Sequence, residues 1–403
     1  MANIDSQFVA DADRIGPTIY TKTINSSAFA KLIPKEPWPD GYSESIQVLT
    51  VERNLPDNID DWTALLSNDG TGNTCNPEAD EVPAGQTLRT YNLEQKRIKS
   101  LPICVNDTRP AFQIDQQVKA MFDNLTNAVK YVWARRSKLE YSRLAEHKMV
   151  AAPGLPQSST HFPTIAPTTK LTQEILNIIY QELIVDSAEM DGGSLGMVNG
   201  APQFILVTDM ATSNDILHQY NTQQAFLWNN TRVPELLQPL GIDRAYLGFY
   251  HSMDNLPRRW NFTGGAWVEV LPYESAVATK GTKQKISAAY RTAEYMDSVV
   301  FLPSVMSFMV PKPISTVGSQ TSFTPQQYMG DFRWLNILSD ATNPLGETGY
   351  YMANIQSGSK PVHPEFGYVI RHKRCPADIG TRDCTESVLP DSSDLGSGES
   401  FLV

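Results

Sequence analysis

The sequence contains little cysteine, with only four among its 403 residues. Four thiols in a chain of this length do not form the disulfide framework that small secreted domains use in place of a large core. The chain starts with a polar segment at Met1 to Asp5, without the apolar core of a secretory signal. We therefore expect a protein that is made and kept in a reducing cytosol.

Long hydrophobic runs are absent as well. The most apolar stretch, Val299 to Val310, is interrupted by Pro303 and two serines and is too short to span a bilayer. Hydrophobic residues make up 41% and charged residues 19% of the chain, as in ordinary globular proteins. The composition predicts two or three packed lobes and no membrane partner.

The chain has fewer basic than acidic residues, 33 against 44, so its formal net charge is −11. A protein that grips phosphates needs the opposite balance, so tight nucleic-acid binding is not expected. The basic groups Arg258–Arg259 and Arg371–Arg374 could contact phosphate or acidic surfaces of a partner, and in an acidic chain we favour the partner surfaces. The sequence also lacks a phosphate-binding loop, a dinucleotide fingerprint and an H-E-x-x-H motif, so no cofactor is expected.

Candidate catalytic residues are few. Ser194 lies in a G-x-S-x-G match, but a predicted helix precedes it where the nucleophile elbow needs a strand, so a helix-stopping turn explains the glycines better. Asp209 follows a buried strand, where α/β sheets place catalytic groups, and it is equally placed to cap the next helix, which we favour. His218 and His251 have no partner at a metal-binding interval.

One cluster contains residue types that bind metals. It consists of His363, His372, Cys375 and Cys384, whose spacing matches no standard zinc finger. The alternatives are a zinc site and free thiols in a terminal loop, and the irregular spacing favours free thiols. The sequence therefore predicts no metal site and no catalytic site.

The longest single element predicted is a helix from Phe112 to Val150. Its apolar residues recur in steps of three, four or seven and draw one stripe along the helix, while Pro110 and Pro153 bound it. About forty residues form a rod of roughly 60 Å, longer than a typical compact domain. The alternatives are an ordinary long helix lying across a sheet and a spine that carries lobes at its ends.

The segments before this helix are extended. Residues 1–48 are punctuated by proline and carry apolar side chains, which predicts an arm that lies on another surface. Period-two alternation at Ser45–Glu52 and Thr87–Leu93 predicts a long hairpin with a glycine-rich tip, and Gln95–Val105 is a further strand. A two-stranded excursion is marginal alone, so this hairpin should lie on the same chain or on a neighbour.

Helices and strands mix in the rest of the chain. Helices are predicted at Thr172–Met190, Asp209–Tyr220 and Pro234–Leu240. Strands are predicted at Gln203–Thr208, Ala245–Tyr250, Ala266–Leu271, Val305–Val310, Phe332–Leu338, Gly349–Ile355 and Tyr368–Lys373, with a further apolar pattern over Tyr290–Phe301. Residues 392–400 are rich in Ser, Asp and Gly and are predicted to be disordered. Such a chain is understandable as a building block whose arm and hairpin complete their packing on neighbouring copies.

This order of parts resembles the major capsid proteins of tailed bacteriophages, which have the Hong Kong 97-type fold. The amino-acid motifs near the C-terminus are the most specific part of the resemblance. It reads G-D-F-R-W-L-N at 330–336, N-P-L-G at 343–346, G-S-K-P at 358–361 and P-E-F-G-Y at 364–368, followed by Arg374-Cys375. The similarity in the order of elements extends over nearly the whole chain, whereas the similarity in amino-acid motifs extends over about fifty residues near the C-terminus.

The resemblance implies an α+β fold divided as follows: an N-terminal arm at 1–48, an extended β-hairpin loop at 49–109, a peripheral domain with the spine helix at 110–190, a mixed α/β axial domain at 191–290, and a return to the peripheral domain with a C-terminal tail at 291–403. It also implies a structural protein of the virion, assembled in the host cytoplasm, rather than an enzyme.

The partners implied by the resemblance are further copies of the chain, in pentamers and hexamers that form an icosahedral shell around double-stranded DNA, together with a portal protein and a separate scaffolding protein. The DNA would be enclosed without sequence-specific binding. Some members of the family crosslink through a loop lysine, but nothing identifies Lys96 or Lys99 as such a residue. The alternatives are a cytosolic α/β enzyme of hydrolase type, with its site near Asp209 and Ser194, and another virion structural protein.

Overall fold

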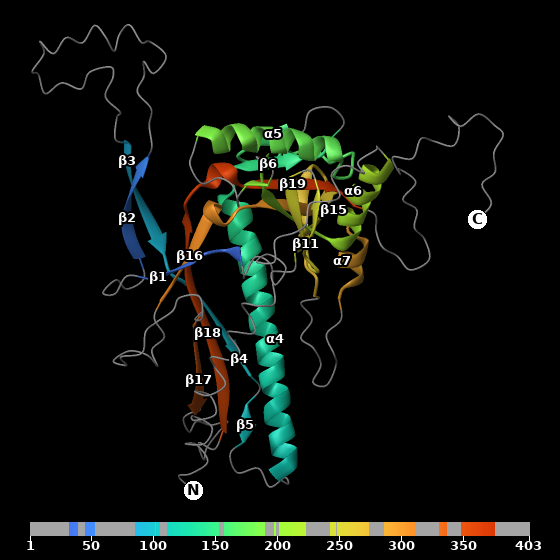
Figure 1. Cartoon of the computed structure of the whole chain (residues 1–403). Helices are drawn as coiled ribbons and strands as arrows, with labels where there is room; N and C mark the ends of the chain where they lie inside the picture. The colour runs from blue at the N-terminus through green and yellow to red at the C-terminus, as the bar shows by residue number, and fades with distance from the viewer. Residues whose placement is uncertain are drawn as a thin grey trace, which may run out of the picture.

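A computed structural model gives the fold of the chain. It describes residues 32–38, 45–52, 85–100, 102–104, 111–152, 157–189, 197–198, 201–222, 242–246, 248–273, 286–311, 330–336 and 348–374. Within them the chain mixes helices and sheets, as predicted, and forms a body from which a long limb and a separate hairpin extend (Figure 1).

A nine-stranded sheet forms the body. Its strands run in the order β11-β12-β10-β15-β19-β6-β7, and a hairpin of β13 and β14 pairs with β15. The strands are β6 (His147–Val150), β7 (Gln157–Ser159), β10 (Phe204–Thr208), β11 (Ile242–Tyr246), β12 (Phe249–Met253), β13 (Arg259–Thr263), β14 (Ala266–Val270), β15 (Tyr295–Phe301) and β19 (Tyr368–Lys373).

The middle of this sheet is covered by helices. Every residue of β10 and β15 is buried, which explains why these strands read as continuous apolar runs rather than alternating ones. Helix α5 (Gln173–Glu189) crosses above β6 and β19 in Figure 1, and its Tyr180 ring meets Phe204 and Phe249 edge-on, both at 5.8 Å. Two shorter helices complete the body, α6 (Met210–Thr222) after β10 and α7 (Ala288–Thr292) before β15.

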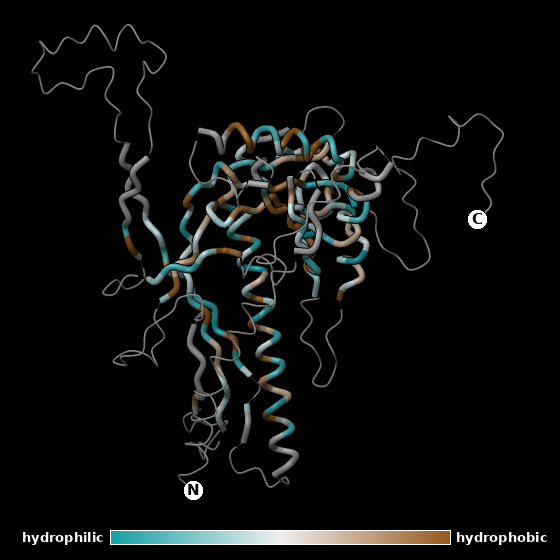
Figure 2. The backbone as a smooth tube through the Cα atoms, in the orientation of Figure 1, coloured by the Kyte–Doolittle hydropathy of each residue, from teal (hydrophilic) through white to brown (hydrophobic). Residues whose placement is uncertain are grey.

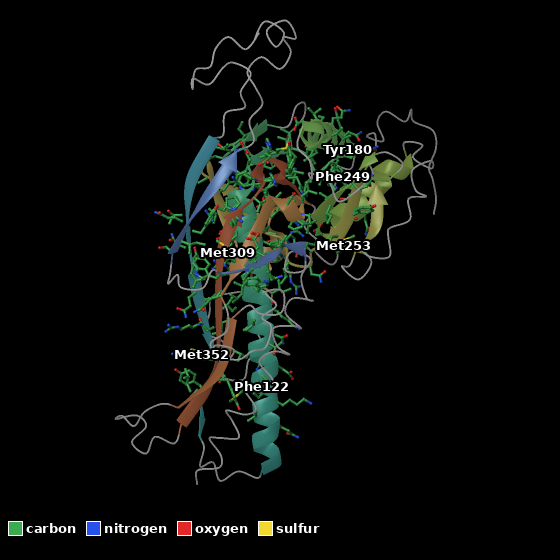
Figure 3. All side chains as sticks on the ribbon, turned by 60° about the vertical axis from the view of Figure 1, so that its left-hand side comes forward. Phe122, Tyr180, Phe249, Met253, Met309 and Met352 are labelled. Carbon is green, nitrogen blue, oxygen red and sulfur yellow. The ribbon has the colours of Figure 1, made fainter. Side chains whose placement is uncertain are left out.

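Helix α4 (Ala111–Leu144) spans both the limb and the body. In the limb a second sheet lies alongside it, in the order β1-β16-β18-β17, with β4 and β5 also paired to β18. These strands are β1 (Lys35–Pro37), β4 (Glu94–Lys99), β5 (Ile103–Cys104), β16 (Met306–Val310), β17 (Gly330–Asn336) and β18 (Thr348–Pro361). The limb core includes Phe122 of α4, whose ring centroid lies 4.5 Å from that of Tyr351 on β18 (Phe122 is labelled in Figure 3).

The apolar stripe of α4 runs without a break from the limb into the body. Met121, Phe122 and Leu125 belong to the same buried cluster as Trp133 and Tyr141, and the last two are fully buried. Tyr141 also donates a hydrogen bond of 2.7 Å to the carbonyl of Val300 on β15. The visible turns of α4 accordingly alternate between hydrophilic and hydrophobic colours in Figure 2.

The hairpin is a separate two-stranded sheet. Strands β2 (Ser45–Glu52) and β3 (Gly85–Asn92) pair antiparallel over their whole length, from Ser45 opposite Asn92 to Glu52 opposite Gly85. Figure 1 shows it standing away from the body. Another small sheet joins β8 (Met197–Val198) to β9 (Ala201–Pro202). No helix in the described residues is both long and apolar enough to cross a membrane.

The predicted helix from Phe112 to Val150 is too long at its C-terminal end. It ends at Leu144, and His147–Val150 form strand β6. The competing interaction is the parallel pairing of β6 with β19, supported by a hydrogen bond from the backbone N–H of His147 to the carbonyl of Gly367 at 3.1 Å. The buried Met149 and Val150 fit a sheet as well as a helix, so the periodicity alone did not distinguish the two.

The predicted strand Ala245–Tyr250 is also wrong as a single element. Strands β11 and β12 form an antiparallel hairpin there, because Gly248 adopts φ 78° between them. A side chain at this position would overlap the ring of Tyr180. Strand β13, which precedes the Gly264–Gly265 turn, was not predicted.

The predicted strand Gln95–Val105 is wrong as a single element, because β4 and β5 are separate strands there. The other predicted elements are confirmed within the described residues, with shifted ends. Residues 290–301 divide into α7 and β15, and β18 continues beyond Ile355 to Pro361. The predicted helix Pro234–Leu240 and the tail at 392–400 lie outside the described residues.

Gly248→Ala should destabilise the fold more than Gly265→Ala. Both glycines have a positive φ, 78° and 80°, but only Gly248 has a side chain in the way. We expect about 1–2 kcal/mol from backbone strain at either site and about 1–3 kcal/mol more from overpacking at Gly248. Urea unfolding of the two variants measures the difference, and equal losses would contradict the packing of Tyr180 against Gly248.

Candidate functional site

A chain of hydrogen bonds in the body involves Thr208, Ser298 and His372. The hydroxyl of Ser298 lies 2.8 Å from Nε2 of His372 and 2.7 Å from the hydroxyl of Thr208. Nδ1 of His372 lies 2.9 Å from the carbonyl of Lys373, which can only accept, so Nδ1 carries a proton. With the ring neutral, Nε2 accepts from Ser298, and Ser298 accepts from Thr208.

This arrangement has the atoms of a serine–histidine pair, yet it is part of the core. Thr208, Ser298 and His372 are all fully buried, and each hydroxyl hydrogen is already engaged. Burial lowers the pKa of His372 below its usual range. The geometry therefore suits a structural network between β10, β15 and β19 rather than attack on a substrate.

The other predicted catalytic candidates are separate. A carboxylate oxygen of Asp209 accepts a hydrogen bond of 2.8 Å from the N–H of Thr212, so Asp209 caps α6 as favoured. His251 is buried on β12, where Nδ1 lies 3.2 Å from the hydroxyl of Ser213. His218 lies in α6, but its side chain is outside the described residues, as is the whole of Ser194.

The four candidate metal ligands are only partly described. His363 contacts its neighbour Glu365 at 2.9 Å, and His372 belongs to the buried network above. Cys375 and Cys384 lie outside the described residues. The described residues hold no group of three metal-ligating side chains.

Arg371 is the most buried charge in the body. It is 1% exposed and makes two hydrogen bonds to Asp297, at 2.7 and 3.1 Å, while Trp260 Nε1 donates to the same carboxylate at 2.8 Å. The guanidinium lies 3.8–4.5 Å from the ring centroids of Phe162, Trp260 and Trp267. This cluster ties the 160–170 loop, through Phe162, and the β13–β14 hairpin, through Trp260 and Trp267, to the sheet.

The interpretation of the basic groups as partner contacts is therefore wrong for at least two of them. Arg371 forms an ion pair with Asp297, and Arg258 forms one with Glu269 at 3.2 Å. A buried charge needs a partner with good geometry, and both partners come from the same chain at distances that the local sequence does not reveal.

The base of the β2–β3 hairpin is anchored by a small apolar cluster of its own. Trp38, Ile46, Tyr91 and Met309 are buried together, with Leu93 packed against them. Gly358 of β18 permits this approach, since a Cβ there would lie 2.8 Å from Trp38 Cζ3. Trp38 follows β1, which pairs in parallel with β16. Trp38 and Met309 thus hold the base of the hairpin.

Polar contacts fix the limb strands to α4. Arg136 pairs with Glu94 of β4 at 2.9 Å and donates to the carbonyl of Ser357 on β18 at 3.0 Å. Glu140 accepts hydrogen bonds from Ser359, at 2.6 Å, and from Arg143, at 2.7 Å. Helical spacing could have shown that Arg136, Glu140 and Arg143 share a face, but not that this face meets β4 and β18.

Comparison with known proteins identifies similar solved structures. No protein-family model and no curated protein matches the chain. The capsid of Ralstonia phage GP4 is similar over 86% of this chain and 88% of that chain, with 10% identity and a TM-score of 0.47. The cyanophage Pam1 capsid asymmetric unit is similar over 87% and 93%, with 11% identity and a TM-score of 0.44. The asymmetric unit of the bacteriophage PhiM1 mature capsid is similar over 86% of this chain and 87% of that chain, with 11% identity and a TM-score of 0.39.

Asp297→Asn should destabilise the body strongly. Removing one charge leaves Arg371 buried without a counter-ion, which typically costs about 3–5 kcal/mol. The matched control is Glu36→Gln, which removes the partly exposed pair with Lys360 at 3.2 Å and should cost less than about 1 kcal/mol. Chemical denaturation measures both. A loss at Asp297 no larger than at Glu36 would contradict the role of the buried pair.

Acid should destabilise the fold partly through His372. An unfolded histidine takes up a proton near pH 6.5, whereas burial keeps the folded His372 neutral to lower pH. The free energy of unfolding should therefore fall as the pH drops below about 6.5, by at most about 1.4 kcal/mol per pH unit from this group, until the folded pKa is reached. His372→Gln should flatten the profile between pH 7 and 5, while His161→Gln, at an exposed site, should not. Parallel profiles for His372→Gln and the unchanged chain would refute this.

Proposed function

We propose that the chain is a major capsid protein of a tailed bacteriophage with the Hong Kong 97-type fold, which self-assembles into pentamers and hexamers of an icosahedral shell around double-stranded DNA. The observation that carries the proposal is the β2–β3 hairpin, a ladder from Ser45 to Asn92 whose described apolar contacts with the rest of the chain, at Ile46, Tyr91 and Leu93, lie at its base. An isolated two-stranded hairpin is marginally stable in water, so this one needs a second surface.

A neighbouring copy of the chain is the economical source of that surface. Strand β1, the hairpin and the limb all extend from one body, and each is held to it by apolar contacts rather than by a flexible tether. Rigid extensions of this kind place the same surface at the same position in every copy. Repetition of one such contact builds a closed ring or shell.

The proposal gives each part of the chain a role. Residues 1–48 would be the arm, 49–109 the extended loop, 110–190 and 291–403 the peripheral domain, and 191–290 the axial domain. A separate scaffolding protein and a portal protein would be partners during assembly, in the host cytoplasm, and the mature location would be the virion. The net charge of −11 suits a shell that encloses DNA without gripping its phosphates.

Two other functions would use the same fold differently. An enzyme needs an accessible reactive group, whereas Asp209 serves as a helix cap and the Ser298–His372 pair is buried with its hydrogen bonds satisfied. Another virion structural protein would share the extensions but assemble with a different symmetry. The shape of the assembled particle distinguishes these functions.

Shortening the hairpin should abolish assembly and leave the body folded. Val48 lies opposite Arg89, so replacing residues 49–88 by Asn-Gly closes the ladder with a two-residue turn and keeps Ile46 and Tyr91 in the base cluster. We expect a folded protein whose unfolding temperature changes by a few degrees, without rings or shells in light scattering and negative-stain electron microscopy. The full chain, co-expressed with the neighbouring viral genes, should form hollow polyhedra.

The control changes a different hairpin. Gly264→Asn alters the tip of β13–β14, where nothing lies within 4 Å and φ is 61°, a conformation that asparagine tolerates. It should assemble like the unchanged chain. Shells from the shortened variant, or a uniform 44.8 kDa monomer from the full chain with its neighbours co-expressed, would overturn the proposal.

A further inference from the structure

A pocket of about 430 Å³ opens between the middle of α4 and the segment from Met253 to Tyr273. Met253, at the end of β12, is labelled in Figure 3. The volume lies within the range of pockets that bind ligands or side chains of a partner. We call it the basic pocket, because its wall carries four cationic side chains, Lys130, Arg135, Lys138 and Arg258, and two anionic ones, Asp254 and Glu269, an excess of two positive charges.

The charges in this wall are unequally paired. Lys138 lies 2.6 Å from Asp254, and Glu269 is shared by Arg258 at 3.2 Å and Arg135 at 3.4 Å. Lys130 is partly exposed and forms no ion pair within the described part of the chain. Because the net charge of the chain is −11, a second copy brings acidic groups in excess to this amine.

Apolar side chains border the basic pocket along β14. Val270 lines the pocket, and its neighbours in sequence, Val268 and Leu271, are 53% and 45% exposed. Ile286, bridged to the lining residue Tyr273, is 37% exposed. Exposed apolar side chains gathered beside charges are typical of a surface that contacts another protein. We call these residues the apolar border of the pocket.

The outer face of α5 has the complementary properties. Glu174 and Glu182 are exposed there, and Val185 on the same face is 59% exposed. Glu182 accepts a hydrogen bond of 3.3 Å from the hydroxyl of Tyr368, whereas Glu174 forms no ion pair within the described residues. The sequence of the helix contains four acidic residues and no basic one, namely Glu174, Glu182, Asp186 and Glu189. Carboxylates beside an exposed valine match the basic pocket and its apolar border.

The basic pocket and α5 lie on opposite faces of the body sheet. The ring of Tyr180 on α5 meets Phe204 of β10 at 5.8 Å, whereas the ring of Tyr141 on α4 meets Phe301 of β15 at 5.1 Å. Phe301 is paired with Ile205, the residue after Phe204, and successive residues of a strand point to opposite faces. In Figure 1 α5 crosses the top of the body, while the middle of α4 lies below it. The two complementary surfaces therefore cannot meet within one copy.

We propose that the basic pocket of one copy of the chain binds the outer face of α5 of a second copy, with Glu174 on Lys130 and Val185 against the apolar border. The contact joins two different surfaces, so it runs head to tail and can continue from copy to copy until a ring closes. It rests on the proposed self-assembly and deepens it by naming the two surfaces that meet.

Reversing the two charges tests the contact in the full chain, co-expressed with the neighbouring viral genes. Lys130→Glu brings a carboxylate against Glu174, and Glu174→Lys brings two amines together. Like charges placed against each other weaken an interface, so each single variant should lower the yield of rings and shells about tenfold or more. The double variant restores an opposite pair and should recover most of that yield. Light scattering and negative-stain electron microscopy measure it.

Two control variants carry the same changes of charge outside the pocket. Lys119→Glu and Asp123→Lys alter exposed side chains on α4 that do not line the pocket. Both should assemble like the unchanged chain. All four single variants should keep the unfolding temperature of the unchanged chain, because none removes an ion pair or a buried side chain.

Zero-length crosslinking locates the contact. A water-soluble carbodiimide joins a lysine amine to a carboxylate that touches it, and mass spectrometry identifies the joined peptides. The Lys130–Glu174 link should be found in chains joined as dimers or larger species and be absent from single chains. Raising the salt to 1 M during the reaction shortens the screening length to about 3 Å and should lower the amount of this link.

Three results would overturn this contact and leave the proposed function standing. One is a normal yield of shells from both single variants, and another is an equal loss from Lys119→Glu, which would indicate a general effect of charge. The third is shells from the unchanged chain without a Lys130–Glu174 link between copies. A full chain that forms no rings, no shells and no such link would overturn the contact and the proposed function together.

Discussion

The structure depends on the burial of α4 against two sheets at once. The helix has 34 residues, a length of about 50 Å, and one stripe of side chains that serves the limb sheet through Phe122 and the body sheet through Trp133 and Tyr141. Each large buried side chain contributes roughly 1.5–3 kcal/mol. Because these contacts belong to one contiguous core, the limb is a rigid part of the body. Strands β16 and β18 reinforce this, since only a few residues separate β16 from β15 and β18 from β19 of the body sheet.

Polar groups determine the register at the centre of the body. Asp297 pairs with Arg371 across β15 and β19, and the next residues, Ser298 and His372, form a second polar contact. Successive strand residues point to opposite faces, so the ion pair lies on one face and the hydroxyl–imidazole contact on the other. A slip by one residue would leave both sets buried without partners, which is far costlier than a shifted apolar contact. The groups that have the atoms of a serine–histidine pair therefore specify the fold.

The sequence predicted elements whose signal is local, and failed where a distant partner decides. The cap at Asp209, the buried strand Phe204–Thr208 and strand Tyr368–Lys373 follow from residue type and spacing, and the structure confirms them. The end of α4 did not follow, because the choice of strand for His147–Val150 rests on pairing with β19, over two hundred residues away. Arg371 illustrates the same limit for sites: its basic neighbourhood suggested a surface, and only the fold places Asp297 and three aromatic rings around it.

The hairpin follows a different rule from the core. Its base is fixed by Trp38, Ile46, Tyr91 and Met309, so its direction is set before any partner arrives. A two-stranded ladder is marginally stable by itself. Fixing the direction in advance reduces the orientational entropy lost on binding, and leaving the ladder marginal keeps most of the stabilising free energy for the contact itself. In the proposed shell a single contact between two copies is then weak, whereas many such contacts together hold the shell strongly. A copy that binds in the wrong place can dissociate, whereas a closed lattice of copies is stable.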